Sequence, residues 1–339
     1  MSKTHVAVFM GGRSEEHDVS MNSGARVAES LDRERYAVTP VVIGRDGNWS
    51  IGGAEALRPA AALSQLDGLN VDCAFIALHG PYGEDGRMQG LLDMIGMPYT
   101  GSGCASSALT MDKVRSKAVV SSQGIRVAGH LALDRPTWAI DSAQVIEAIE
   151  KDIGFPCVIK AVSQGSSKGV VICDSLLSLR KDMETVMDVE DNVFVEKFVK
   201  GVEVTCSVLD TDPSGRILPL PLTEICPRTA RFFDYEAKYT PGATEEITPA
   251  RITDELTDDI MDMAAHVHEV MGCSGWSRSD FIIDEHGPVW IEVNTIPGMT
   301  ATSLFPQAAA AAGISYEQLV ASLVDDAVRR ADIREAGGR

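Results

Sequence analysis

The chain lacks an excess of positive charge, long apolar runs and paired cysteines. Its 339 residues carry 30 Lys and Arg against 49 Asp and Glu, a formal net charge of −19, which excludes a generally basic nucleic-acid binder. The longest apolar stretches, such as Val6–Met10 and Ala308–Ala312, fall far short of the roughly 18 residues that cross a bilayer. We therefore expect no transmembrane helix and neither a membrane nor a nucleic-acid partner.

The N-terminal segment also lacks the features of a secretory signal. Its short apolar run leads directly into Gly11, Gly12 and Arg13, with no small-residue cleavage site. The seven cysteines are odd in number, scattered and never spaced as Cys-x-x-Cys, so neither a zinc site nor a disulfide framework is predicted. We expect a cytoplasmic protein whose cysteines are mostly buried and free.

Two common nucleotide-binding motifs are missing. No G-x-x-x-x-G-K-[S/T] sequence occurs, and residues 101–106 form a G-x-G-x-x-S pattern without the last glycine of a dinucleotide fingerprint. The sequence therefore supports neither a P-loop nor a Rossmann NAD site.

The composition is that of a globular protein, with 45% apolar and 23% charged residues. The length predicts two or three domains. In the first hundred residues, β-branched runs alternate with amphipathic stretches, which predicts an α/β unit with a parallel sheet. The expected strands are His5–Met10, Val38–Ile43 and Cys73–Leu78, and the expected helices are Ser20–Leu31 and Met88–Met94.

Two further units follow, and we predict domains over residues 1–101, 102–195 and 196–339. The central unit is expected to contain helices at Asp112–Gln123 and Ser142–Ile153 and strands at Pro156–Lys160 and Val170–Ile172. For the third unit, the sequence predicts strands at Glu203–Asp210 and Ile217–Leu220, a helix at Asp254–Met271 and a hairpin over Trp276–Asn294.

Glycine loops follow two of the predicted strands of the first unit. One loop begins at Gly11 and leads to Glu15, Glu16 and His17, and the other begins at His79. Because open α/β sheets bind ligands at the carboxyl ends of their strands, this edge is a candidate ligand site.

The predicted hairpin carries three oxygen-bearing side chains that we expect on one face. Glu292 and Asn294 are two residues apart on one strand, and Asp280 on the partner strand can reach the same side. Carboxylate and amide oxygens suit Mg²⁺, with phosphates and water completing its octahedron. The alternative is that this face is simply solvated; Arg278 beside Asp280 favours the metal site.

The loop from Gly165 to Gly169 matches the G-x-S-x-G pattern of serine hydrolases. That motif must join a strand to a helix, whereas here the chain continues as a strand, so the context excludes a nucleophile elbow. A glycine-rich loop between two strands is instead suited to cover phosphates with its backbone N–H groups. Lys113 and Lys160 would add the positive charge that a polyphosphate needs, although either alone could be a surface residue.

Other candidate residues lie at the predicted junction of the second and third units and beyond it. Glu196 and Glu203 bracket the junction, where the base and ribose of a nucleotide could lie. The segment Arg231–Tyr239 mixes aromatic and charged residues without helical or strand periodicity, which is typical of a functional lid or of disorder. Lys238 and Tyr239 are candidates to close over a substrate.

Together these motifs resemble the D-alanine–D-alanine ligase family of the ATP-grasp superfamily, over nearly the whole chain. The resemblance implies a three-domain α/β fold, α+β in its ATP-grasp part, with a Rossmann-like N-terminal domain and ATP between the central and C-terminal domains. The matching segments are Gly11–Ser20, Ala77–Gly80, Gly83–Gly86, Tyr99–Gly103, Met111–Lys113, Gln164–Ser167, Phe233–Tyr239, Arg278–Asp280 and Glu292–Thr300.

The resemblance also implies a role for each matching residue. Glu16 would pair with the ammonium of the first D-alanine in a pocket shared with His79, and would hold the lid closed with Ser166 and Tyr239. The nucleotide would be bound by Lys113, Lys160, Lys238, Glu196 and Glu203. Two Mg²⁺ or Mn²⁺ ions would be bound by Asp280, Glu292 and Asn294. The oxyanion site would comprise Arg278 and the Gly298 amide, and the second D-alanine would contact Ser303 and Leu304.

The implied reaction is ATP-dependent joining of two D-alanine molecules through an acyl phosphate, for peptidoglycan synthesis, by a homodimer. The segment Glu236–Tyr239 keeps the pattern that favours a dipeptide product over D-alanyl-D-lactate. One departure is Lys160-Ala161, where the family usually has Lys-Pro. Three alternatives stay open: a different second substrate such as D-serine or D-lactate, a non-catalytic nucleotide binder, and a dehydrogenase on the N-terminal unit.

Overall fold

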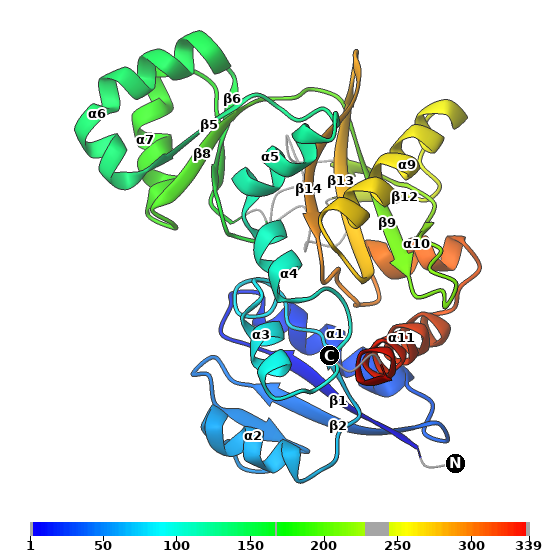
Figure 1. Ribbon diagram of the computed structural model, residues 1–339. Coiled ribbons are helices and arrows are strands. Elements are labelled where there is room, and N and C mark those ends of the chain that lie inside the picture. The colour runs from blue at the N-terminus through cyan, green and yellow to red at the C-terminus, as the bar shows by residue number, and fades with distance from the viewer. Residues whose placement is uncertain (1–2, 167, 228–243, 337–339) are drawn as a thin grey trace.

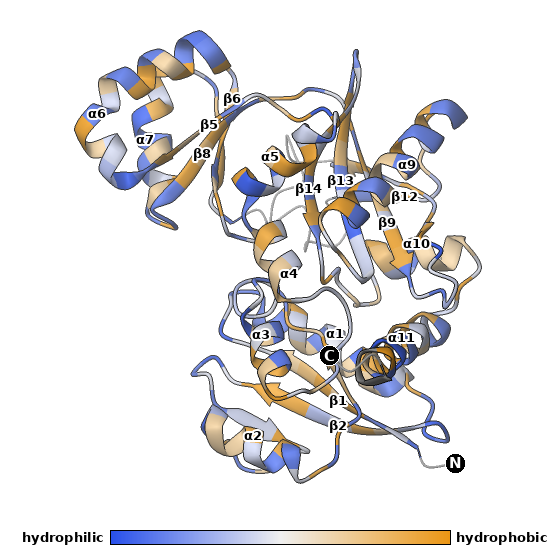
Figure 2. Cartoon of the chain, viewed as in Figure 1, coloured by the Kyte–Doolittle hydropathy of each residue, from blue (hydrophilic) through white to orange (hydrophobic). Residues whose placement is uncertain are grey.

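The computed structural model describes residues 3–166, 168–227 and 244–336. The chain forms three β-sheets covered by helices (Figure 1). In Figure 2 the hydrophobic residues concentrate on the strands, while the helices that face outward carry many hydrophilic residues. Among the described helices, none is both long and apolar enough to cross a membrane.

The first sheet has the strand order β3-β2-β1-β4. Its central strand β1 is parallel to β2 and β4, whereas the edge strand β3 is antiparallel to β2. Continuous apolar runs form β1 and β4 because helices cover both faces of a parallel sheet, and Val6–Phe9 are fully buried. The elements are β1 (Thr4–Gly11), α1 (His17–Ser30), β2 (Tyr36–Ile43), β3 (Trp49–Ile51), α2 (Pro59–Asp67), β4 (Cys73–Ile76) and α3 (Arg87–Met94).

The central sheet is antiparallel throughout, in the order β5-β8-β6-β7. Strand residues alternate between its faces. Cys157, Ile159, Val193 and Val195 pack in a core with the two long helices of this unit, which lie on one side of the sheet (Figure 1). The elements are β5 (His130–Asp134), α6 (Arg135–Ala148) with a π-helical turn (Ile149–Ile153), β6 (Cys157–Ala161), β7 (Val170–Cys173), α7 (Leu176–Met187) and β8 (Asn192–Lys197).

The third sheet runs in the order β12-β11-β9-β13-β14, with β10 paired to β9. The helices α5 and α9 pack against it around buried Trp290 and Phe281. Its strands are β9 (Val202–Asp210), β10 (Leu218–Pro219), β11 (Thr223–Pro227), β12 (Thr244–Ile247), β13 (Gly275–Asp284) and β14 (Gly287–Asn294). The remaining helices are α4 (Cys104–Met111), α5 (Lys113–Ser122), α9 (Asp254–Val270), α10 (Leu304–Ala311) and α11 (Tyr316–Ala336).

The C-terminal helix α11 returns to the first sheet, where it contacts β4 and α1 (Figure 1). Its buried residues Leu319, Val320 and Leu323 belong to the same apolar core as β1. The two ends of the chain therefore share one core, which fixes the first sheet to the rest of the molecule.

The α/β prediction and the predicted strands are confirmed, with three corrections. The helix predicted at Ser142–Ile153 follows a kink at Asp141 and ends in a π-helical turn. A helical segment that was not predicted precedes the kink; it begins at Arg135, and Asp134 caps it by accepting a bond from Thr137 N. The first sheet is not wholly parallel, because β3 is antiparallel. The strand predicted at Ile217–Leu220 forms over Leu218–Pro219 alone.

The predicted domain division stays a prediction. Its second boundary, between residues 195 and 196, falls inside β8 of the central sheet. All seven cysteines are free, five of them buried and two half-buried.

Candidate active site

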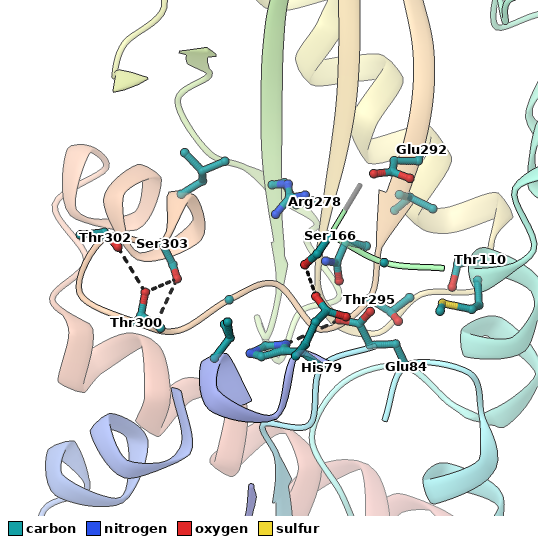
Figure 3. A pocket seen from close by; sticks show the side chains of 18 of the residues that line it. His79, Glu84, Thr110, Ser166, Arg278, Glu292, Thr295, Thr300, Thr302 and Ser303 are labelled. Atoms are coloured by element: carbon teal, nitrogen blue, oxygen red, sulfur yellow. Dashed lines mark hydrogen bonds and ion pairs between the residues drawn. The ribbon is translucent and has the colours of Figure 1, made fainter. Parts of the chain in front are cut away.

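A cavity of about 550 Å³ lies where the first sheet, the flap between β6 and β7, and the hairpin β13–β14 meet. Figure 3 shows Ser166, Arg278 and Glu292 around it, with His79 and Glu84 at the side of the first sheet. The segment from Gly298 to Leu304 forms another wall. These elements are far apart in the sequence, so the cavity exists only in the folded chain.

Glu16 contacts the flap directly. Its carboxylate oxygen Oε1 accepts a hydrogen bond from the Ser166 hydroxyl. Two glycines leave room for this carboxylate, because a Cβ atom on Gly80 would lie 2.2 Å from Oε2, and one on Gly165 would lie 2.7 Å from it. Ser14 Oγ donates to the carbonyl of His79 at 2.6 Å and joins the two glycine loops.

His79 is buried next to Glu16 and has polar partners on both ring nitrogens. Nε2 is hydrogen-bonded to Ser23 Oγ at 2.9 Å, and Nδ1 lies 3.1 Å from the Ile296 carbonyl and 3.6 Å from Glu84 Oε1. Burial lowers the pKa of His79, but the Glu84 and Glu16 carboxylates outweigh it, so the pKa is raised above its ordinary value. The site therefore favours a protonated imidazole at the first sheet.

The hairpin places its polar residues as strand alternation predicts. Asp280 is paired with Glu292 and Arg278 with Asn294 across β13 and β14. The side chains of Asp280 and Glu292 are 16% and 30% exposed. This degree of burial contradicts the alternative of a simply solvated face.

Arg278 makes a two-pronged ion pair on this face. Its Nε and Nη2 atoms donate to Oδ1 and Oδ2 of Asp280 at 2.8 and 3.0 Å. Burial opposes the charge, but Asp280, Glu292 and Glu84 raise the pKa of Arg278 further above its ordinary value. A permanent cation thus faces the cavity.

The oxygen atoms of Asp280, Glu292 and Asn294 could hold a hard cation. Asn294 Oδ1 accepts a bond from Ile296 N at 2.8 Å, which orients the amide and leaves one lone pair of its oxygen. The described residues contain no cluster of three or more His, Cys, Asp or Glu side chains suited to a metal. The three oxygen-bearing side chains of Asp280, Glu292 and Asn294 nevertheless fit Mg²⁺, because this ion prefers oxygen ligands and keeps water and phosphate as further ligands in proteins.

A second cavity of about 130 Å³ lies between the central and third sheets. Lys113, residues 164–166 and Glu292 line both cavities, so the flap separates two parts of one site. Lys160, Glu196 and Glu203, the other nucleotide-binding candidates, also line the second cavity. Lys113 Nζ is 3.3 Å from Glu292 Oε2 and donates to the Gln164 carbonyl at 2.7 Å.

The far wall of the first cavity is the turn before α10. Ser303 Oγ accepts a bond from Thr300 N at 3.0 Å, and a Cβ atom on Gly298 would lie 2.7 Å from it. Leu304 begins α10. Gly298, Ser303 and Leu304 all line the cavity, and the roles that the resemblance implies for them stay predictions.

The structure brings together every predicted site residue that it describes; Lys238 and Tyr239 lie outside the described residues. Sequence reasoning missed Lys117 and gave Glu84 no role. Lys117 follows Lys113 by four positions, so both lie on one face of α5, and Glu84 lies in the glycine loop after His79. Those spacings are the signals that could have identified them.

The family models and the relatives that match this chain all indicate the same family. The chain matches the family model described as D-ala D-ala ligase C-terminus over residues 119–325, and the N-terminus model over 5–66 and 54–102. It is 41% identical to a D-alanine–D-alanine ligase of Syntrophobacter fumaroxidans, covering 95% of this chain and 97% of that protein.

Two solved structures are similar along nearly their whole length. The D-alanine–D-alanine ligase of Bacillus anthracis complexed with ATP has a TM-score of 0.78 at 31% identity, covering 98% of this chain and 99% of the other. The VanG D-Ala:D-Ser ligase of Enterococcus faecalis has a TM-score of 0.81 at 30% identity, covering 96% and 100%. This chain therefore belongs to the D-alanine–D-alanine ligase family of ATP-grasp ligases.

Proposed function

We propose that this protein is an ATP-dependent ligase that joins two D-alanine molecules into D-alanyl-D-alanine, for peptidoglycan precursor synthesis. The observation that carries the proposal is the convergence of the Glu16–Ser166 contact and the Arg278–Asp280 pair on one cavity. An anion and a cation at opposite sides of a small pocket suit an amino acid, which carries both charges.

The first D-alanine would bind between these charges. Its ammonium group would pair with Glu16, and its carboxylate would face Arg278. His79 lines the same cavity and would form part of the pocket for this amino acid.

The nucleotide would occupy the second cavity. Ile172, Phe198 and Ile291 offer apolar surface to the base from two different sheets, with Glu196 and Glu203 on the side of the base and ribose. Lys113 and Lys160 supply positive charge for the phosphates, and Lys238 is proposed to reach the γ-phosphate. Residues 164–166 would cover the phosphates from above.

Asp280, Glu292 and Asn294 would hold two Mg²⁺ or Mn²⁺ ions. Bound there, such ions would supply positive charge beside the phosphates, where negative charge develops during phosphoryl transfer. A chelator should therefore abolish activity, and added Mg²⁺ or Mn²⁺ should restore it; full activity of the chelated protein would contradict this assignment.

The proposed chemistry has two steps. A carboxylate oxygen of the first D-alanine attacks the γ-phosphorus of ATP, which forms an acyl phosphate and releases ADP. The deprotonated amine of the second D-alanine then attacks the acyl carbon, and phosphate leaves. Arg278 and the Gly298 amide would stabilise the oxyanion, while Ser303 and Leu304 would hold the carboxylate of the second D-alanine.

Closure of the site protects the intermediate. An acyl phosphate exposed to water hydrolyses, so a closed flap favours transfer to the second amino acid. The Ser166–Glu16 hydrogen bond supports such closure, and Tyr239 is proposed to join it.

The decisive experiment measures ADP release with and without D-alanine and identifies the product by mass. We expect ADP release to depend on D-alanine and the dipeptide to accumulate in equal amount. ATP turnover that is indifferent to D-alanine, or NAD binding in a fluorescence titration, would contradict the proposal.

The second substrate needs its own test, because the VanG structure resembles this chain and its protein acts on D-Ala and D-Ser. The same assay should be run with D-serine and D-lactate in competition with D-alanine. We expect D-alanyl-D-alanine as the main product; preferential formation of a mixed product would assign a different second substrate.

A further inference from the structure

Lys117 is a buried lysine behind the nucleotide cavity. Its side chain is 1% exposed, and it does not belong to the lining of either cavity described above. Lysine is rarely buried to this degree unless it forms an ion pair. The residue that pairs with Lys117 therefore indicates the role of its ammonium charge.

The partner is Glu196, which two lysines share. Lys117 Nζ lies 3.0 Å from Glu196 Oε2, and Lys160 Nζ lies 2.5 Å from Glu196 Oε1. The other described contact of the Lys117 ammonium is the ring of Trp290, whose centroid is 5.7 Å away. Within the described part of the chain, the charge of Lys117 is therefore directed at Glu196.

Strand pairing explains why Lys160 and Glu196 face the nucleotide side. Val158 on β6 is paired with Glu196 on β8, so Lys160, two residues further along, is the diagonal neighbour of Glu196 on the same face. The opposite face packs against α6 and α7. Lys117 reaches Glu196 from α5, a helix that packs on the third sheet.

The charges of these three side chains decide what a phosphate would encounter. The two ammonium groups outweigh the effect of burial and hold the pKa of Glu196 at about 2, so the carboxylate is ionised. Burial lowers the pKa of Lys117, although Glu196 works against this by favouring the charged form. One anion between two cations leaves a net charge of +1, and Lys160 presents that charge to the cavity.

We propose that Lys117 is a positioning residue for the nucleotide: it neutralises Glu196 from behind, so that the ammonium of Lys160 keeps its charge for the phosphates. This inference rests on the proposed binding of ATP. Without Lys117, Glu196 and Lys160 would form a neutral pair, and the attraction between Lys160 and a polyphosphate would be largely lost.

The test compares binding of ATP and of adenosine by isothermal titration in the full-length protein. In Lys117→Met, which has a similar shape without the charge, we expect the Kd for ATP to rise roughly tenfold while that for adenosine changes less than about twofold. Lys181→Met, on the exposed outer helix α7, is the matched control and should bind both ligands as the wild type does.

A second substitution separates this role from a merely structural one. Adding Glu196→Gln to Lys117→Met restores the net charge to +1, so we expect the ratio of the Kd values for ATP and adenosine to return to within about threefold of the wild-type ratio. A contact between Glu196 and the base would change both Kd values and leave this ratio unaffected. If Lys117→Met does not fold, Lys117→Gln removes the same charge while keeping a donor toward Glu196.

Three results would overturn the inference: an unchanged Kd for ATP in the lysine variant, an equal loss for ATP and adenosine, or no recovery in the double variant. A wild-type protein that fails to bind ATP is a separate outcome, which would contradict the proposed function itself.

Discussion

Arg278 combines burial with a fixed direction. Its guanidinium is held by both oxygens of Asp280 and faces the cavity that Glu16 closes from the other side. A cation that is already oriented stabilises a developing oxyanion without reorganising. We therefore expect Arg278 to stabilise the transition state more than it stabilises the bound substrate.

The first prediction concerns Arg278→Ala. Removing one oxyanion donor typically lowers kcat about 100- to 1,000-fold, and we expect a loss of this size with ATP affinity changed less than about threefold. Steady-state kinetics and ATP titration measure the two quantities. Arg126→Ala is the control, because Arg126 pairs with Asp284 at the other end of the hairpin; equal losses in both variants would refute a transition-state role.

The second prediction concerns pH and the His79–Glu84 pair. The folded-state pKa of His79 is raised above its ordinary value of 6.5, so protonation favours the folded state. This contribution is complete below pH 6.5 and is lost as the pH rises through the folded-state pKa. We expect Glu84→Gln to lower the free energy of unfolding by about 1–2 kcal/mol at pH 6, with a smaller effect at higher pH.

Denaturant unfolding at several pH values checks this expectation. Glu285→Gln is the matched control, because Glu285 and His286 form an exposed pair with side chains 85% and 73% accessible, and such pairs contribute little. A destabilisation by Glu84→Gln that grows toward alkaline pH would contradict the assignment.

At this scale, sequence reasoning succeeded where periodicity applies. The common face of Asp280, Glu292 and Asn294 follows from strand alternation alone. The contact between Glu16 and Ser166 joins residues 150 positions apart, which no local pattern encodes. The resemblance to a family identified both residues, and the fold shows how they meet. Lys117 was missed because its spacing of four from Lys113, which places both lysines on one face of α5, was not used.

At the scale of elements, the flap between β6 and β7 contributes residues 164–166 to the walls of both cavities. Ser166 has a positive φ of 48°, a backbone conformation that costs free energy in a residue other than glycine. It is held there while its hydroxyl donates to Glu16. The flap geometry and the position of Glu16 therefore depend on each other.

The third prediction concerns Gly165→Ala. The added methyl group would lie 2.7 Å from Glu16 Oε2, so the flap and the carboxylate must separate. We expect KM for D-alanine to rise several-fold, and more ADP to be released per dipeptide formed, because an open flap admits water. Gly129→Ala is the control, since its Cβ would meet no atom within 4 Å; unchanged coupling in Gly165→Ala would contradict the role of the flap.

The elements themselves were predicted unevenly from the sequence. The strands β1, β2 and β4 form from β-branched runs that a reader can recognise, and the hairpin has a clear turn. The helices α2, α4, α7, α10 and α11 and the strands β3, β5, β8, β11 and β12 were not predicted. Strands such as β5, whose sequence His-Leu-Ala-Leu-Asp contains no β-branched residue, are completed by a neighbour from a distant part of the chain, so their local sequence is insufficient to identify them.

At the scale of the whole molecule, α11 joins the two ends of the chain. Asp326 is 1% exposed and binds both Arg329 and Arg330. Arg330 Nη2 also donates to the carbonyls of Tyr99 and Gly101, where the chain leaves the first sheet. The buried Asp326 carboxylate and its two partly exposed arginines thus link the part of the chain that carries Glu16 to the part that carries Arg278.

The last prediction follows from this connection. Asp326→Asn removes a buried acceptor from two arginines that are 34% and 22% exposed. Hydrogen bonds to charged groups contribute about 1.5–3 kcal/mol, so we expect a destabilisation of this order. Hydrogen exchange should then increase in the first sheet and in α11 together, because both belong to one core. Asp332 is exposed on the same helix, so Asp332→Asn is the control and should cost about 1 kcal/mol or less. If Asp326→Asn loosened α11 while the first sheet kept its protection, the two ends of the chain would be shown to unfold independently, and α11 would not be what holds Glu16 opposite Arg278.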